Sequence, residues 1–293
     1  MVSLAIGALF GTAAALVYKV ATGIGCRSFH LIAVERAVMF TLFAVCSVRL
    51  SWYEFNFPVF LISVLAGTVI IVARWAILVA LTIGKASTCY VIWNLSIALP
   101  VVFSIFIWSE IPNIPQTIGI CFVPLGIFWM RETESAAPSG AGAAAAGGIM
   151  PDSRRRRVWL LLMLLCFLLE GVFALCFKMI KELDLEDSQL SFLLLYNAVA
   201  MIGAAAMLLK SRSLPQGKEL KIGLLTGLLI GISSIFWLRA IIQLEGIVFF
   251  PVATVCAILM LALSSQLIWR ERISWIQRLG IAVAIAAILL ISI

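Results

Sequence analysis

The chain has 293 residues, of which 63% are hydrophobic and only 12% are charged. Soluble domains carry about 25% charged residues, so this composition excludes a soluble fold and indicates a protein that crosses a membrane several times. The net charge of +7 does not indicate a nucleic-acid partner, because basic residues in the connections between spans usually set orientation.

Apolar runs of about 20 residues follow one another along the chain, as expected for segments that cross a bilayer. Their length and lack of two-residue alternation predict α-helices, because a spanning segment must satisfy its backbone hydrogen bonds internally. The first run ends in Tyr18-Lys19 and lacks a basic start, so we expect a retained span rather than a signal peptide. The predicted fold is an all-α polytopic membrane protein with ten transmembrane helices, at residues 2–22, 29–49, 57–82, 86–109, 113–131, 157–180, 190–209, 220–244, 247–269 and 274–293.

Residues 132–156 differ from the rest of the chain in composition. They contain a low-complexity stretch of Ala, Gly, Pro and Ser and end near a basic cluster, Arg154 to Arg157. Such a segment cannot bury a core, so we predict a flexible linker. It divides the chain into a first half, 1–131, and a second half, 157–293, with five predicted helices in each.

A short motif occurs once in each half. Trp108-Ser109-Glu110 is followed by Gly119, and Trp269-Arg270-Glu271 is followed by Gly280, so the motif recurs after 161 residues. Because each half holds an odd number of helices, the second copy must enter the membrane from the opposite side. This predicts two inverted five-helix repeats, an arrangement typical of secondary transporters. We interpret Glu110, Gly119, Glu271 and Gly280 as structural, with each acid accepting hydrogen bonds at the start of the next helix and each glycine permitting close packing.

Charged side chains inside the predicted spans are candidates for function, because each costs about 2.5–3.5 kcal/mol at the centre of a helix. Glu170 is the deepest acid, and a carboxyl group in a low dielectric can take up a proton near neutral pH, so it is the candidate for proton coupling. A structural pair with Arg74 or Arg239 is the alternative. Both arginines are also candidates for the wall of a substrate cavity, since a guanidinium can hold a carboxylate or phosphate with two hydrogen bonds.

Glu35 and Arg36 lie near the start of the second run. Adjacent residues point about 100° apart on a helix, so they cannot both face one partner. A Lys19–Glu35 pair with Arg36 facing the cavity fits this geometry best, and the alternative is that Lys19 extends to the membrane interface. Asn197 occupies the corresponding place in the second half, 161 residues after Arg36, and is a further cavity candidate.

The remaining candidates for the cavity wall are aromatic or amide side chains. Polar residues in the fourth run recur at spacings of three and four, which places them on one helix face, directed away from lipid. Two tryptophans at matching positions of the two halves could stack on a substrate, and positions facing lipid or the core are the alternative. These candidates are Tyr90, Trp93, Asn94, Trp75 and Trp237.

The sequence has no cluster of His, Cys and acidic residues at metal-ligand spacing, so we expect neither a metal site nor a cofactor. No Gly-x-x-x-x-Gly-Lys-Ser/Thr stretch is present, which argues against an ATP-driven pump. The single histidine, His30, has no acid four residues away, so we do not expect an enzyme. The expected partners are a small-molecule substrate, the lipid bilayer and a proton as coupling ion, without nucleic acid. Monomer and homodimer both remain open.

A series of small residues and an acid links the third run to the fifth: Ala80-Leu81, Gly84, Ala86, Ser87, Leu99-Pro100, Glu110 and Gly119. Together with ten helices in two halves, it resembles the drug/metabolite transporter superfamily, in its ten-helix EamA-like branch. The second half departs from the pattern, because Leu261 stands opposite Pro100. The resemblance implies a secondary active transporter for a small organic metabolite or drug, amino-acid-like or amphipathic, that is often exported. A nucleotide-sugar carrier or a flippase for a lipid-linked intermediate on the same fold is the alternative.

Two indications of orientation conflict. Of the 21 Lys and Arg residues, 15 lie in the odd-numbered connections and 3 on the other side, with Arg36, Arg74 and Arg239 inside the spans. The positive-inside rule then places the acidic connection at 182–187 and both termini outside. The family resemblance implies termini in the cytoplasm. The compact layout favours the plasma (inner) membrane.

Overall fold

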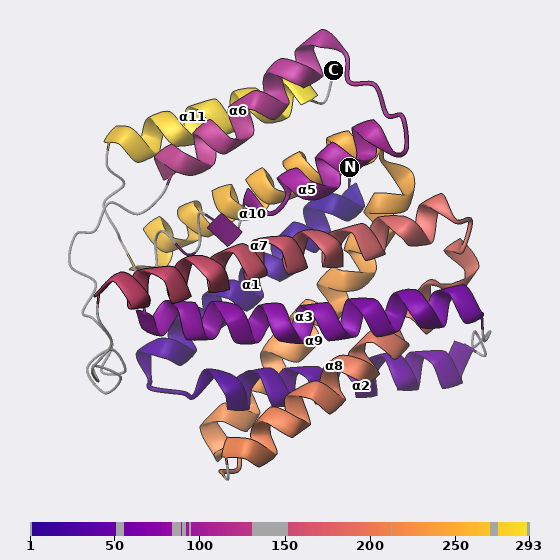
Figure 1. Cartoon of the computed structure of the whole chain (residues 1–293), viewed down its shortest axis with the longest axis vertical. Coiled ribbons are helices and arrows are strands. Elements are labelled where there is room, and N and C mark those ends of the chain that lie inside the picture. Colours follow the sequence, from indigo (N-terminus) through magenta and orange to yellow (C-terminus); the bar gives the residue numbers. More distant parts are fainter. Residues whose placement is uncertain are drawn as a thin grey trace. The chain divides into compact units, whose positions relative to one another are not determined.

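The computed structural model describes residues 2–50, 56–83, 89, 92–93, 95–130, 152–211, 213–269 and 275–291. Among these residues the secondary structure is helical, with no β-strand (Figure 1). The α-helices are α1 (Val2–Gly23), α2 (Ser28–Leu50), α3 (Phe57–Ile83), α5 (Ala98–Phe106), α6 (Ile114–Met130), α7 (Asp152–Glu182), α8 (Gln189–Ser211), α9 (Gly217–Gln243), α10 (Gly246–Trp269) and α11 (Trp275–Ile291), and the 3-10 helix η1 covers Glu186–Ser188.

In the described part of the chain, five segments are long and apolar enough to cross a membrane: Phe29–Val48, Phe57–Ile77, Arg156–Glu182, Glu186–Lys210 and Gly217–Gln243. Shorter apolar helices cover Val2–Tyr18, Ile114–Leu125, Gly246–Ala257 and Arg278–Ile291. The chain is therefore a helical multi-pass membrane protein, as its composition predicts.

The predicted fourth run, 86–109, contains a break. Ser96 and Ile97 form a turn, and α5 begins directly after it at Ala98. Pro100 lies in the first turn of α5, where its missing N–H removes no hydrogen bond that the helix needs. Pro100 therefore lies directly after the break in this run.

Helix α7 is longer than the predicted sixth span. It begins at Asp152, whereas the sequence predicts a start at 157. The basic cluster Arg154 to Arg157 is therefore helical and belongs to α7, although we assigned most of it to the linker. Arginine has a high helix propensity, and an aspartate at the first position is favoured by the helix dipole, which explains the earlier start. The rest of the predicted linker, 132–151, lies outside the described residues.

The helices form two compact units. Unit 1 takes residues 1–71, 173–245 and 256–265, and unit 2 takes residues 72–172, 246–255 and 266–293. Each unit draws segments from both halves of the sequence. Units 1 and 2 therefore do not coincide with the two predicted repeats, each of which is one continuous stretch of the sequence.

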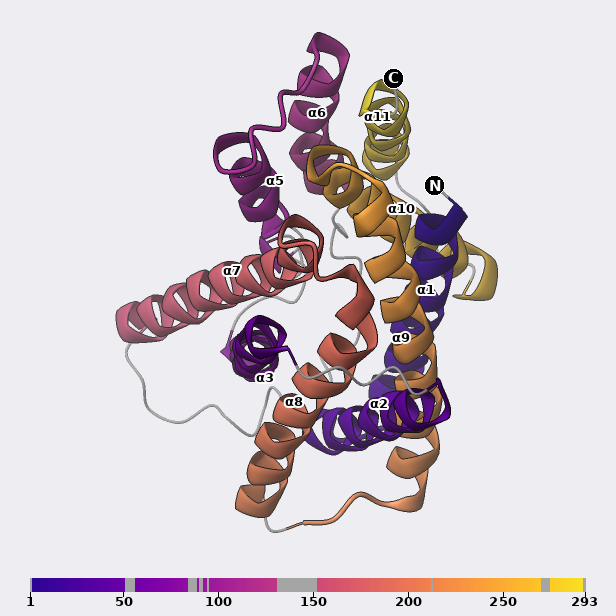
Figure 2. The same cartoon turned by 90° about the vertical axis from the view of Figure 1, so that its right-hand side faces the viewer.

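In unit 1, α9 packs against α1 and α2, and α2 also packs against α8 (Figure 2). Glycines at spacings of four on α9 bring it close to α2. A Cβ atom added to Gly223 would lie 2.6 Å from Val34 Cβ, and one added to Gly227 would lie 2.8 Å from Val38 Cβ. A side chain at either position would collide with α2, so the glycine face fixes the distance between the two helices.

In unit 2, α6 packs against α11. Gly119 lies at a close approach of the two helices, because a Cβ atom there would lie 2.9 Å from the carbonyl oxygen of Ala287 and 2.7 Å from Ile291 Cγ1. The packing role predicted for Gly119 is therefore seen in the structure. Gly280 of the second motif copy is buried on α11.

Candidate functional site

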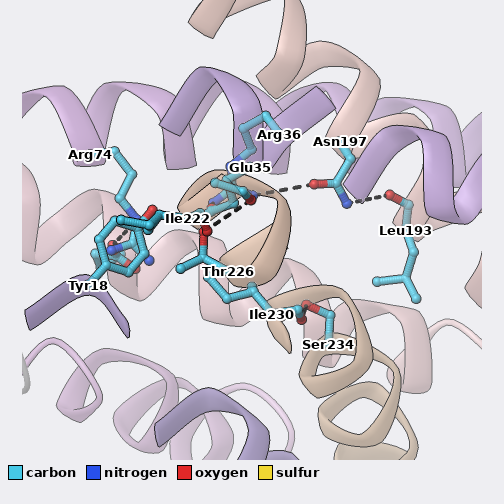
Figure 3. A network of polar contacts seen from close by, with 12 residues as sticks. Tyr18, Glu35, Arg36, Arg74, Leu193, Asn197, Ile222, Thr226, Ile230 and Ser234 are labelled. Atoms are coloured by element: carbon cyan, nitrogen blue, oxygen red, sulfur yellow. Dashed lines mark hydrogen bonds and ion pairs between the residues drawn. The ribbon is translucent and has the colours of Figure 1, made fainter. Parts of the chain in front are cut away.

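A polar network lies inside unit 1, between α1, α2 and α8 (Figure 3). Arg36 Nη1 donates to Asn197 Oδ1 at 3.3 Å, and Asn197 Nδ2 donates to the carbonyl oxygen of Leu193 at 2.7 Å. Arg36 Nη2 also lies 3.1 Å from Glu35 Oε1, and the Tyr18 hydroxyl donates to the other carboxylate oxygen of Glu35. The structure thus brings together two of the predicted cavity residues, Arg36 and Asn197. We call Tyr18, Glu35, Arg36 and Asn197 the central network.

The central network is almost completely shielded. Glu35 is 2% exposed, Arg36 4% and Asn197 0%. An ion pair at this depth is held by its hydrogen bonds. Removal of one partner would leave the other charge buried and unpaired and would lower the free energy of unfolding by about 3–5 kcal/mol. Arg36 Nε makes no hydrogen bond within the described residues, so this N–H group is an unused donor.

The partner of Glu35 differs from the one we predicted. Tyr18 takes the place expected for Lys19, whose side chain lies outside the described part. The difference is a single position on α1, which turns the side chain by about 100°. Lys178 on α7 is fully buried, and its Nζ lies 3.6 Å from Glu182 Oε1.

A second arginine cluster lies in unit 2. Arg74 Nε lies 3.9 Å from Glu170 Oε1, and Arg74 Cζ lies 4.6 Å from the centre of the Trp93 ring. The guanidinium therefore contacts a carboxylate and an aromatic face, the latter worth about 0.5–2 kcal/mol. Arg74 was one of the two structural partners proposed for Glu170. The coupling role of Glu170 stays a prediction.

A cavity of about 700 Å³ opens at one end of unit 1. Arg239, another predicted cavity residue, lines it from α9. Leu193 lines it from α8, and the carbonyl oxygen of Leu193 is the acceptor for Asn197, so the cavity wall adjoins the central network. The lining consists of Ser3, Glu186, Asp187, Gln189, Leu190, Leu193, Ile235, Arg239, Ile242 and Gln243.

At the other end of unit 1, five residues join the α1–α2 connection to the start of α9. His30 Nδ1 lies 2.7 Å from Glu219 Oε2, and His30 Nε2 lies 2.9 Å from Ser213 Oγ. Glu219 also accepts hydrogen bonds from the backbone N–H of Arg27, at 2.9 Å, and of Gln216, at 2.8 Å. We call Arg27, His30, Ser213, Gln216 and Glu219 the polar clamp.

Sequence reasoning missed the polar clamp. His30 and Glu219 are 189 positions apart, so a search for an acid close to the histidine could not find the pair. The one local signal is the spacing of Gln216 and Glu219, which form a capping box at the start of α9. Through their contacts, Ser213, His30 and Glu219 are linked in the same order as the serine, histidine and acid of a hydrolase triad. Arg27 Nη1 also donates a hydrogen bond to the Ser213 oxygen, at 3.1 Å, and we interpret the cluster as structural.

The tryptophan candidates take separate places. Trp75 is 39% exposed. Trp237 packs against α1, because a Cβ atom added to Gly7 would lie 2.4 Å from Trp237 Cδ1. Neither tryptophan is among the residues that line the cavity at Arg239. Tyr90 and Asn94 lie outside the described residues.

Glu110 caps a helix, as its motif predicts, but a different helix from the expected one. Its carboxylate oxygens accept hydrogen bonds from the backbone N–H of Gly246, at 3.0 Å, and of Ile247, at 2.9 Å, at the start of α10. The following helix, α6, has its own cap, in which Asn113 and Gln116 exchange hydrogen bonds of 2.8 and 3.0 Å. Glu271, the second copy, lies outside the described residues.

In the part of the chain that the structure describes, no group of three or more His, Cys, Asp or Glu side chains is placed to hold a metal ion. No family model matches the chain, and no curated protein matches it. Twenty-nine chains of solved structures match. One of them, described only as the crystal structure of a protein, is similar over 99% of this chain and 94% of its own, with a TM-score of 0.75 and 15% sequence identity. At that identity the likeness shows a shared fold and nothing of the function.

Proposed function

We propose that this protein is a secondary active transporter that carries a small organic solute, amino-acid-like or amphipathic, out of the cell by alternating access. The plasma (inner) membrane is its proposed location, and the EamA-like branch of the drug/metabolite transporter superfamily is its proposed family. The observation that carries the proposal is the central network. Three polar groups, Glu35, Arg36 and Asn197, are buried within helices of a membrane protein, where ionisable residues most often mark a substrate or ion pathway.

The proposed architecture is ten transmembrane helices in two inverted five-helix repeats. Arg36 and Asn197 support it, because they are 161 positions apart, the offset of the repeated motif, and they hydrogen-bond to each other. The packing of α6 against α11 also supports it, since these helices carry Gly119 and Gly280, the two copies of the motif glycine. Elements related by a two-fold axis contact their own counterparts where they lie close to that axis.

The contacts of Arg36 suggest how a solute would enter the central network. Its guanidinium is held by a carboxylate on one side and by a neutral amide on the other. A solute carboxylate would form a charge-assisted hydrogen bond, which is roughly twice as strong as a neutral one. It would therefore displace Asn197 Oδ1, or use the remaining Nε donor, while Glu35 keeps Arg36 in place.

Reconstitution of the purified protein in proteoliposomes tests this proposal. We expect saturable counterflow for an amino acid or a lipophilic cation, with the rate at least tenfold lower in Arg36→Gln and unchanged in the control Arg157→Gln, an exposed arginine at the start of α7. With an imposed pH gradient, Glu170→Gln should retain counterflow and lose gradient-driven accumulation. Absence of flux for every solute contradicts the proposal. Flux of nucleotide sugars alone would favour the alternative carrier.

A further inference from the structure

The charged residues that line the cavity differ from those of the central network. Arg239 on α9 and Glu186 and Asp187 on η1 are exposed side chains on the cavity wall. Within the described residues, none of the three side chains makes a hydrogen bond or an ion pair. In contrast, Glu35 has Arg36 as its partner. The cavity therefore keeps one guanidinium and two carboxylates available for a ligand.

Four of the other lining residues are aliphatic. They are leucines of α8 and isoleucines of α9, and amides of Gln189 and Gln243 add hydrogen-bonding groups. The volume of about 700 Å³ falls within the range of roughly 300–1,000 Å³ that is usual for small-molecule sites. The aliphatic residues are Leu190, Leu193, Ile235 and Ile242.

We propose that this cavity binds a small zwitterionic solute with an aliphatic body. Arg239 would hold the carboxylate with two hydrogen bonds, and Glu186 and Asp187 would hold the ammonium group. The aliphatic residues would contact the hydrocarbon part of the solute. This inference rests on the proposed transporter function and assigns to it a substrate class and a second binding site, separate from the one proposed at Arg36.

The charge balance of the cavity separates this class from the other solutes considered. Two carboxylates against one guanidinium give the lining a net charge of −1 when all three are ionised. A phosphate-bearing solute would meet two like charges, which disfavours a nucleotide sugar. A simple amine would pair with the carboxylates and leave Arg239 without a partner, so it would bind less tightly than a zwitterion.

Leucine and two analogues that each lack one charge provide the test. The analogues are 3-methylbutylamine, which lacks the carboxylate, and 4-methylpentanoate, which lacks the ammonium group. Equilibrium binding to the full chain in detergent or nanodiscs is measured by calorimetry. We expect leucine to bind at least tenfold more tightly than either analogue. Equal affinities for the three probes, or no binding of any of them, would overturn the inference.

Charge-removing variants assign the two ends of the solute. Arg239→Gln should weaken leucine binding at least tenfold and leave the amine unaffected, whereas the double variant Glu186→Gln/Asp187→Asn should weaken leucine and leave the acid unaffected. Arg239→Lys should restore part of the affinity. Lys218→Gln, an exposed residue at the opposite end of α9, is the matched control. Unchanged leucine affinity in Arg239→Gln would show that leucine binds elsewhere and would overturn the assignment.

Binding and flux fail independently, which separates this inference from the proposed function. Binding is measured without a gradient and without transport. Leucine binding that depends on Arg239 but is accompanied by no flux supports the site and contradicts the transporter. Counterflow of another solute with no leucine binding supports the transporter and contradicts the site.

Discussion

The cavity and the polar clamp occupy opposite ends of unit 1 and use similar residues in opposite ways. Helix α9 reaches both, with Glu219 in the clamp and Arg239 in the cavity, 20 positions and therefore about 30 Å apart. In the clamp, both oxygens of Glu219 and both ring nitrogens of His30 have partners, and these residues are 5% and 2% exposed. In the cavity, Arg239 is exposed and has no partner among the described residues.

The difference shows how the same side-chain chemistry serves stability at one end and binding at the other. A buried group whose hydrogen bonds are all made within the protein stabilises the fold and has little left for a ligand. An exposed charge on a concave wall contributes little to stability and can be paired by a solute. The acidic connection lies at the cavity end and basic connections at the clamp end.

Removal of the clamp carboxylate should have the largest effect on stability. Glu219→Ala leaves the buried His30 Nδ1 and two part-buried backbone N–H groups without their acceptor, and an unsatisfied buried group costs about 1–3 kcal/mol. We expect an overall loss of about 3–5 kcal/mol, measured by thermal or denaturant unfolding in detergent. Glu186→Ala at the cavity end is the matched control. Similar losses for the two variants would show that the two ends do not differ.

The glycine face between the two ends should show an intermediate effect. A Cβ atom on Gly227 would lie 2.8 Å from Val38 Cβ and 3.0 Å from the carbonyl oxygen of Glu35. We expect Gly227→Ala to push α9 away from α2 and to lower the free energy of unfolding by about 1–3 kcal/mol. Gly217→Ala is the control, because no atom lies within 4 Å of its added Cβ. A neutral Gly227→Ala would mean that this helix contact is not close.

Removal of the cavity charge should have the smallest effect on stability. Arg239 is exposed and makes no ion pair within the described residues, so Arg239→Gln should change the free energy of unfolding by no more than about 0.5 kcal/mol. The same unfolding assay measures it beside Glu219→Ala. A loss above about 1.5 kcal/mol would place Arg239 with the structural residues and would weaken its assignment to ligand binding.

Local features of the sequence predict local features of the structure. Apolar runs of sufficient length predict α1, α2 and α3 to within one residue at each end. The break before α5 lies next to Pro100, and the close contact of α9 with α2 lies at glycines spaced four apart, so both coincide with local features of the sequence. The sequence predicts Arg36 and Asn197 only as separate cavity candidates, and their hydrogen bond is seen in the tertiary structure alone.

Partners far apart in the chain were decided by the tertiary structure. The composition and periodicity determine that the chain is a helical membrane protein and which of its residues are too polar to face lipid. Composition and periodicity do not determine which of these polar residues contact one another. Tyr18 contacts Glu35 because the packing of α1 sets which side chain faces α2. Glu110 accepts hydrogen bonds from the start of α10 because α10 packs next to it in the fold. His30 contacts Glu219, 189 positions further along the chain, because the packing of helices sets which side chains are neighbours. Such a contact leaves no local pattern in the sequence.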